Sequence, residues 1–394
     1  MLWMEVFLTR SKKMIKLLLF VSLSAALMAE SYEQFLAKAI EKSPYLNASV
    51  LMMDQAKLEG KKIVRYDNPI LEVEKSKFRS ENGYRVGINQ PIRLWGVGED
   101  KEQMSRSMVA NAKANVALER SRFIKELSLL YVDYAQNQKR LILAQEELKI
   151  AQSINDLSKQ RYANGSLSKA LMLQADVAYA DAASNLLDHQ KEAIKSYDAL
   201  REYAGIMEEV SIDSQHLFTR MQDEKSSPEL TLMSTENTLK ASQAKLETRV
   251  IESIGVFGEY EKEPDQNIYR AGISIPLPLF NTKNEEKVLQ AIQTRQNTLF
   301  LKAHSDRLGL HKKRLLREIA SLESLLQQRQ ENLKNAQELL AMYQDAYAIA
   351  NVNLLELYEI KNRRIATQEE IISLQSQINR STIEFNYLQG AYNE

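Results

Sequence analysis

The chain has 394 residues, with 52 Lys and Arg against 52 Asp and Glu, and it contains no Cys. The even charge balance gives no reason to expect a nucleic-acid partner, which a basic excess would indicate. The lack of Cys excludes disulfides, thiolate metal sites and thiol catalysis. Only 12 Gly and 7 Pro occur, and this scarcity of helix-breaking residues favours long helices.

The N-terminal segment carries the features of a secretory signal peptide. Lys12, Lys13 and Lys16 precede an apolar run at residues 17–27, and the small residue Ala29 follows. The run is too short to cross a bilayer as a helix, which takes about 20 residues. We expect residues 1–29 to be a signal peptide cleaved after Ala29. A buried core helix is the alternative interpretation.

A predicted helix over residues 32–66 is followed by two predicted strands, residues 69–78 and 83–94. In the second strand Tyr84, Val86 and Ile88 alternate with Arg85 and Gly87. Alternation with period two over about ten residues matches the length of a membrane-spanning strand, although a soluble half-buried hairpin gives the same pattern.

Residues 99–164 contain neither Gly nor Pro, so one uninterrupted helix on the order of 100 Å long is predicted there. A break at Tyr162–Leu167 separates it from a second long helix. Leu127, Tyr134, Leu141 and Leu148 recur every seven residues in the first helix. A sustained period of seven indicates helices packed side by side in a left-handed supercoil.

The remaining chain repeats this order of elements. A shift of 185 residues places Tyr84 on Tyr269, Tyr162 on Tyr347 and Gly205 on Gly390. We therefore predict a first repeat at residues 30–205, a linker at 206–228 and a second repeat at 229–394. The second repeat is expected to hold a helix at 229–252, strands at 254–262 and 268–279, and two long helices joined by a turn at Tyr347–Asn353.

The strand count constrains how such a chain could meet a membrane. Four strands cannot close a membrane barrel, which takes about eight or more, and an open sheet edge cannot sit in lipid. If the strands span a membrane, several copies must share one barrel, and the same symmetry places the long helices in a ring. A coiled-coil rod without a pore is the simpler interpretation of the helices alone.

These features together resemble the TolC family of outer-membrane efflux proteins over essentially the whole mature chain. The resemblance rests on the signal peptide, the two repeats, the strand-end segment Gly272–Asn281, and an Arg-Tyr-x-x-Gly turn at Arg161–Gly165 followed by Leu173-Gln174-Ala175. It implies a mainly α protomer with a small β part. Three copies would form an α-barrel of long helices and one shared 12-stranded transmembrane β-barrel.

The resemblance also implies location and partners. The chain would lie in the outer membrane with a long periplasmic extension, dock on a periplasmic adaptor and serve an inner-membrane transporter. It would act as a passive export duct for small solutes. We expect no enzymatic activity, no cofactor, no metal site and no nucleic-acid partner. The alternative is a periplasmic coiled-coil adaptor or structural protein without a pore.

The resemblance places two candidate sites near the turns between long helices. Glu356 and Glu359 lie three apart and therefore share a helix face. With Tyr347 they match the family's periplasmic gate, and a solvated helix face is the plainer interpretation. The expected adaptor contacts at the helix tips are Arg161, Tyr162, Gly165, Ala350 and Asn351. Gly165 suits a left-handed helix end, and we expect Asn351 or Asn353 to replace it in the second turn.

Overall fold

The computed structural model describes residues 29–78, 81–222, 225–349 and 351–393. The predicted signal peptide lies outside these residues, apart from Ala29. The chain forms two compact units, and each predicted repeat contributes to both. Unit 1 comprises Met1–Pro44, Phe123–Arg220 and Arg314–Asn386, and unit 2 comprises Tyr45–Arg122, Met221–Lys313 and Tyr387–Glu394. The division into two sequence repeats stays a prediction.

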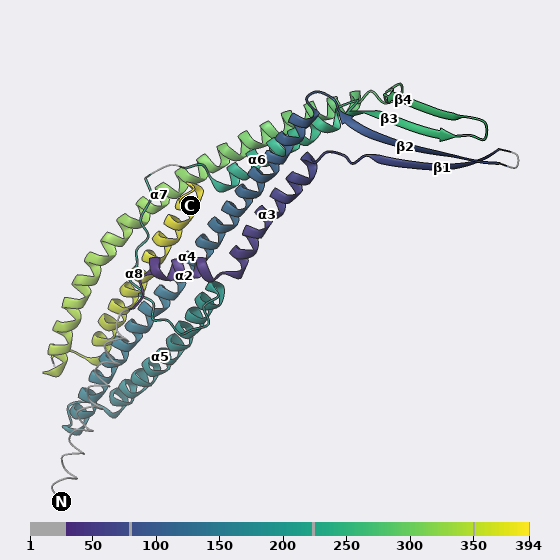
Figure 1. Cartoon of the computed structure of the whole chain (residues 1–394). Coiled ribbons are helices and arrows are strands. Elements are labelled where there is room, and N and C mark those ends of the chain that lie inside the picture. The colour runs from purple at the N-terminus through teal and green to yellow at the C-terminus, as the bar shows by residue number, and fades with distance from the viewer. Residues whose placement is uncertain (1–28, 79–80, 223–224, 350, 394) are drawn as a thin grey trace, which may run out of the picture. The chain divides into compact units, whose positions relative to one another are not determined.

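The elements follow the predicted order, with helices dominating (Figure 1). The helices are α2 (Tyr32–Lys42), α3 (Pro44–Val64), α4 (Val97–Ala163), α5 (Lys169–Ala204), α6 (Pro228–Glu247), α7 (Asn284–Ala348) and α8 (Leu354–Leu388). The strands are β1 (Ile70–Phe78), β2 (Glu81–Arg93), β3 (Ser253–Lys262) and β4 (Asn267–Ser274). The mainly helical fold with a small β part is confirmed.

Three predicted boundaries are wrong. The helix expected over residues 32–66 is two helices that break at Ser43, because the following Pro44 disfavours helical geometry in the residue before it. The helix expected to reach residue 252 ends at Glu247. The last strand ends at Ser274 instead of residue 279. Pro276 and Pro278 follow it, and proline has no N–H to donate to a strand ladder.

The long helices are those that the seven-residue period predicts. Helix α4 has 67 residues and α7 has 65, so each is on the order of 100 Å long. The heptad residues Leu127 and Tyr134 are buried in α4, and α7 likewise buries Leu308 and Leu315, which are also seven residues apart. Side-by-side packing of the helices therefore covers the heptad rows.

Within unit 1, α8 lies along α4 and is tied to it by ion pairs. Lys361 Nζ is 2.8 Å from Glu147 Oε1, and Arg364 Nη2 is 2.7 Å from Glu146 Oε2. Farther along, Arg140 pairs with Glu369 and Lys125 pairs with Glu384. Because these pairs repeat over most of α8, they fix which residues of the two helices lie opposite each other.

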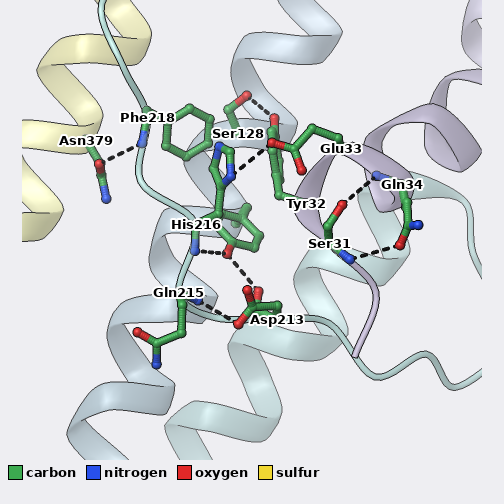
Figure 2. A network of polar contacts seen from close by, with 11 residues as sticks. Ser31, Tyr32, Glu33, Gln34, Ser128, Asp213, Gln215, His216, Phe218 and Asn379 are labelled. Atoms are coloured by element: carbon green, nitrogen blue, oxygen red, sulfur yellow. Dashed lines mark hydrogen bonds and ion pairs between the residues drawn. The ribbon is translucent and has the colours of Figure 1, made fainter. Parts of the chain in front are cut away.

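The connecting segment before residue 220 is held to the rest of unit 1 by a partly buried polar network (Figure 2). The Tyr131 hydroxyl donates to the Asp213 carbonyl at 2.7 Å and accepts from the His216 backbone N–H at 3.1 Å. His216 Nδ1 lies 3.1 Å from Glu33 Oε1, and its ring packs against Tyr32. Tyr131 is thus satisfied by backbone groups, and its burial raises the pKa of its hydroxyl.

Unit 2 contains one antiparallel sheet in the order β1-β2-β3-β4 (Figure 1). The register pairs Val73 with Val86, Val86 with Tyr260, and Tyr260 with Tyr269, so these apolar side chains share one face. Leu71, Val73, Val86, Ile88, Tyr269 and Ile273 on this face are exposed. The predicted alternation is confirmed, and the apolar face is uncovered in the single chain.

The opposite face of the sheet carries a chain of charges from one edge to the other. Arg85 pairs with Glu74 and lies 3.9 Å from Glu259. Arg270 lies 3.8 Å from Glu259 and 2.5 Å from Glu261. Alternating signs on neighbouring strands make the cross-strand pairs attractive. The sheet is therefore apolar on one face and charged on the other.

The start of α4 is anchored to α6 by a buried carboxylate. Asp100 in the first turn of α4 is buried, and its oxygens lie 2.7 Å from Lys245 Nζ and 2.6 Å from Arg249 Nη2. Burial alone would raise the pKa of Asp100, but the bonds from Lys245 and Arg249 prevail and lower it. Asp100 thus stays ionised next to the sheet.

Among the helices in the described ranges, none is both long enough and apolar enough to cross a membrane.

Candidate functional site

The two turns between long helices meet at one end of unit 1. The first turn (residues 164–168) joins α4 to α5, and the second turn (residues 349–353) joins α7 to α8. The Arg161 guanidinium connects them. Its Nη1 donates to the Tyr347 carbonyl at 3.1 Å, and Nη2 lies 3.5 Å from the Ser166 carbonyl. Arg161 therefore bonds to the backbone of both helix ends.

Tyr347 is fully enclosed. Its exposed fraction is 0%, and its ring belongs to an apolar cluster with Ile154, Leu340, Leu354 and Leu357. The Tyr347 hydroxyl is 2.9 Å from Ser158 Oγ on α4, which also donates to the Ile154 carbonyl at 2.8 Å. The Arg161 guanidinium carbon lies 4.5 Å from the centre of the Tyr347 ring, within the range of a cation–π contact.

The first turn has the predicted helix-end geometry. Gly165 adopts a left-handed conformation with φ of 72°, and the Ser166 N–H donates to the Arg161 carbonyl at 2.8 Å. Ser168 then caps α5 by accepting the Leu171 N–H at 3.3 Å. These bonds explain why an Arg-Tyr-x-x-Gly pattern ends one helix and allows another to begin.

The second turn is built differently, and the expectation of a left-handed Asn is wrong there. Within the described residues Lys283 is the one non-glycine position with a positive φ, so Asn351 and Asn353 do not replace Gly165. Asn353 instead begins α8: its side-chain oxygen accepts the Glu356 N–H at 2.9 Å. Its amide nitrogen donates to Glu356 Oε1 at 2.8 Å. A side-chain cap takes the place of the glycine.

Glu356 and Glu359 lie on the exposed face of the first turns of α8. On the other face Leu354 and Leu357 are buried against the Tyr347 cluster. The apolar contacts thus fix the side on which the two carboxylates lie. Glu356 is further oriented by Asn353, whereas Glu359 forms no ion pair with another described residue. One chain presents one such pair to solvent.

The structure brings some predicted site residues together and not others. Arg161 and Tyr347 are in contact. Tyr162, Gly165 and Asn351 are exposed near the turns, as an adaptor contact requires. Ala350 lies outside the described residues. The roles predicted for these residues stay predictions.

Two residues next to the gate candidates were not predicted from the sequence. Lys361 is 4% exposed and holds its ammonium group 2.8 Å from Glu147 Oε1 and 5.8 Å from the centre of the Tyr358 ring. Burial raises the pKa of the Tyr358 hydroxyl to about 12, and that hydroxyl has no hydrogen-bond partner among the described residues. Both side chains face inward, one helical turn beyond Leu354 and Leu357. Their spacing of four residues from these leucines is the feature of the sequence that could have predicted their burial.

The charged groups of the described ranges include no cluster of three or more side chains that could hold a metal ion. The arrangement at the turn end is one of helix caps, a buried ring and exposed carboxylates. Such groups can hold two helix ends together and present negative charge to a passing solute.

The chain is similar to known proteins both in part of its sequence and in its structure. Residues 72–206 match the family model described as "Outer membrane efflux protein". No curated protein matches the sequence. The structure resembles VceC of Vibrio cholerae, with a TM-score of 0.74 and 15% identity, covering 91% of this chain and 95% of that one. It also resembles the CmeC outer membrane channel of Campylobacter jejuni, with a TM-score of 0.74 and 12% identity over 91% of this chain and 85% of that one.

A further similar structure is the MtrE outer membrane channel of Neisseria gonorrhoeae, with a TM-score of 0.71 and 11% identity, covering 90% of this chain and 88% of that one. These likenesses establish a shared channel fold over nearly the whole chain. The family is one of channels and not of enzymes, which confirms that expectation. Over residues 72–206 the chain matches the outer membrane efflux protein family, and over nearly its whole length it has the fold of the outer-membrane channels to which it is similar.

Proposed function

We propose that three copies of this chain assemble into a passive export duct for small solutes. The observation that carries the proposal is the sheet of unit 2, which has two free edges and exposes an apolar face. Lys75, Lys77 and Lys262 interrupt this face toward the hairpin end of the sheet. An open edge is not tolerated in lipid, so the strands must be closed by further copies. Three copies with four strands each give one closed sheet, whose charged face lines a water-filled passage.

The proposed duct has no energy source of its own. We expect an inner-membrane transporter to supply the energy and a periplasmic adaptor to join the two. The exposed residues at the turn end, Tyr162, Gly165 and Asn351, are the proposed adaptor contacts, together with Ala350. Arg161 supports them by fixing the backbone of both turns.

The proposed periplasmic gate lies at the turn end. Threefold assembly would bring two carboxylates from each copy, Glu356 and Glu359, around one entrance. Such a ring attracts cations and repels anions. Tyr347 is proposed to hold the entrance closed, because its bond to Ser158 joins α7 to α4 and its carbonyl is bound by Arg161. Opening requires α7 to move relative to α4, so these contacts must break.

Reconstitution of the purified protein in planar bilayers tests the proposed duct. We expect discrete conducting steps, together with a particle mass in detergent of three chains. A coiled-coil adaptor or rod, the alternative function, has no pore and would leave the bilayer silent. A monomer that conducts nothing would overturn the duct and the trimer together.

The gate is tested by neutralising its charge. Glu356→Gln combined with Glu359→Gln should lower the ratio of K⁺ to Cl⁻ permeability, by on the order of a few-fold, because the field at the entrance weakens. The control is Glu331→Gln with Glu338→Gln, two exposed glutamates of α7 farther from the turn. Unchanged selectivity in the first variant, or an equal change in the control, would contradict the assignment.

A further inference from the structure

The lysines of the sheet lie on its apolar face, whereas its glutamates lie on the other face. Side chains alternate along a strand, so the cross-strand register assigns each residue to one face. Lys75, Lys77 and Lys262 share the face of Val86. The acidic residues of the described strands share the opposite face and are Glu72, Glu74, Glu81, Glu259 and Glu261. The strands therefore place three positive charges and no negative charge on the apolar face.

The three lysines are exposed, and none of them forms an ion pair with another described residue. On the opposite face, by contrast, Arg85 pairs with Glu74 and Arg270 pairs with Glu261. An unpaired lysine on a lipid-facing strand is costly at the centre of a bilayer and costs little near the membrane surface. The lysines therefore place the hairpin end of the sheet at the membrane surface, where lipid headgroups can supply the missing negative charge.

One row across the four strands consists of residues that can donate hydrogen bonds. Lys75 lies opposite Tyr84 in the register, and Tyr84 lies opposite Lys262. Asn267 completes the row beside Lys262. The two lysines are separated by two strand spacings, about 10 Å, so their flexible stems can reach one headgroup above Tyr84. Phosphate oxygens are negatively charged acceptors, which match such a row of donors.

Tyrosines of the apolar face adjoin this row. The ring centre of Tyr260 lies 6.1 Å from that of Tyr84 and 5.3 Å from that of Tyr269. The Tyr260 hydroxyl donates to Asn267 Oδ1 at 3.0 Å, so it points toward the donor row. Tyrosine at a membrane surface has this orientation, with its ring against the acyl chains and its hydroxyl among the headgroups. The tyrosines thus indicate the same level of the membrane surface as the lysines.

A shallow hollow in the apolar face lies on the side of the tyrosines away from the hairpins. Its floor is formed by Gly258 and Ala271, which lie opposite each other, and its sides by Val86, Ile88, Tyr260 and Tyr269. A Cβ added at Gly258 would meet no described side chain within 4 Å, so the hollow is open above it. Gly258 is four residues from Lys262, about 13 Å along the strand. A lipid whose phosphate lies at the donor row can therefore place an acyl chain in the hollow.

We propose that this surface binds a membrane lipid with a phosphate-bearing headgroup. Lys75 and Lys262 hold the phosphate, Tyr84 and Asn267 are further donors, and one acyl chain lies over Gly258. Charge complementarity favours an anionic lipid, because this end of the face carries ammonium groups and the strands add no carboxylate there. The inference rests on the proposed duct, in which this face meets lipid. It adds the class of lipid that is bound and the level of the membrane surface on the sheet.

Electron paramagnetic resonance of spin-labelled lipids tests the proposed preference. The full chain is reconstituted in phosphatidylcholine vesicles that contain a trace of phosphatidic acid or of phosphatidylcholine, labelled on an acyl chain. The spectrum separates lipids immobilised at the protein from those of the free bilayer. The ratio of the two immobilised fractions is the preference for phosphatidic acid. We expect a preference on the order of a few-fold, because lysines near a membrane surface attract anionic lipids. Equal fractions would overturn the inference.

Two variants test the two parts of the site. Lys75→Gln combined with Lys262→Gln should remove the preference, because the amides keep hydrogen-bond donors but not the charge. Gly258→Leu should lower it, because the larger side chain fills the hollow. The control is Lys113→Gln with Lys302→Gln, which removes the same charge from exposed lysines of α4 and α7. A preference that survives in either variant, or that falls equally in the control, would overturn the lipid site.

Conductance in planar bilayers separates this inference from the proposed duct. The lysines lie on the face away from the charged passage, so the lysine variant should form trimers and conduct like the natural protein. Trimers of the natural protein that conduct but show no lipid preference would overturn the lipid site and leave the duct standing. A natural protein that is monomeric and does not conduct would overturn the duct and, with it, the lipid-facing position of this surface.

Discussion

Replacing Tyr347 by Phe removes one hydroxyl from the turn end of unit 1 and leaves the ring in its apolar cluster. The lost bond to Ser158 Oγ is 2.9 Å long and buried. Ser158 keeps its bond to the Ile154 carbonyl at 2.8 Å, so no donor is left unsatisfied. The change therefore costs one neutral hydrogen bond, about 1 kcal/mol. The bond joins α4 to α7. Its removal therefore destabilises only those states of the channel in which the two helices remain in contact.

If the contact belongs to the closed entrance, about 1 kcal/mol shifts the ratio of open to closed channels by about fivefold. Single-channel recording in planar bilayers measures this ratio as the open probability. The matched control is Tyr343→Phe, one turn earlier on α7, whose ring packs against the same cluster and for which no hydrogen bond is seen among the described residues. An open probability that is unchanged or lower in Tyr347→Phe, or raised equally in the control, would refute the reasoning.

Two further predictions concern the stability of the natural protein. Asp100→Asn should lower the free energy of unfolding by about 2 kcal/mol, measured by urea denaturation in detergent. The loss stays below the 3–5 kcal/mol of a fully buried pair because Lys245 and Arg249 are partly exposed. Because the folded pKa of Asp100 is lowered, its contribution is present above the ordinary Asp value of 3.8 and is lost as the pH falls through the folded pKa. The difference between the two proteins should therefore vanish in acid, and a difference that persists there would contradict the ion-pair account. Tyr358→Phe should leave the melting temperature unchanged or raise it by a few degrees, because it removes a buried hydroxyl without a partner; a fall of several degrees would show that the hydroxyl is bonded.

Much of the fold could be predicted from the sequence because it depends on local periodicity. A period of seven placed Leu127 and Tyr134 on the buried side of α4, and a period of two placed Val86 and Ile88 on the apolar face of the sheet. Both follow from the geometry of the backbone alone. Two of the three wrong boundaries lie where a proline changes the backbone, at Pro44 and at Pro276, because a pattern of apolar residues carries no information about a missing N–H.

The candidate site could be predicted only in part. Gly165 was expected at a left-handed helix end because few other residues adopt it, and the structure confirms this geometry. The second turn could not be predicted by analogy, since a cap by Asn353 solves the same problem with a side chain. Arg161 was placed at the tip by the family pattern, but nothing in its neighbourhood in sequence indicated Tyr347 as its partner.

The sequence by itself determined the long helices, the two-faced strands, and the resemblance that named the family. These properties arise from residues within a few positions of one another, where spacing fixes direction. Only the tertiary structure decided which residues meet across the chain: Arg161 with the Tyr347 carbonyl, Lys361 with Glu147, and Asp100 with Arg249. Such contacts depend on the register between helices, which many weak packing interactions set together and no local pattern encodes.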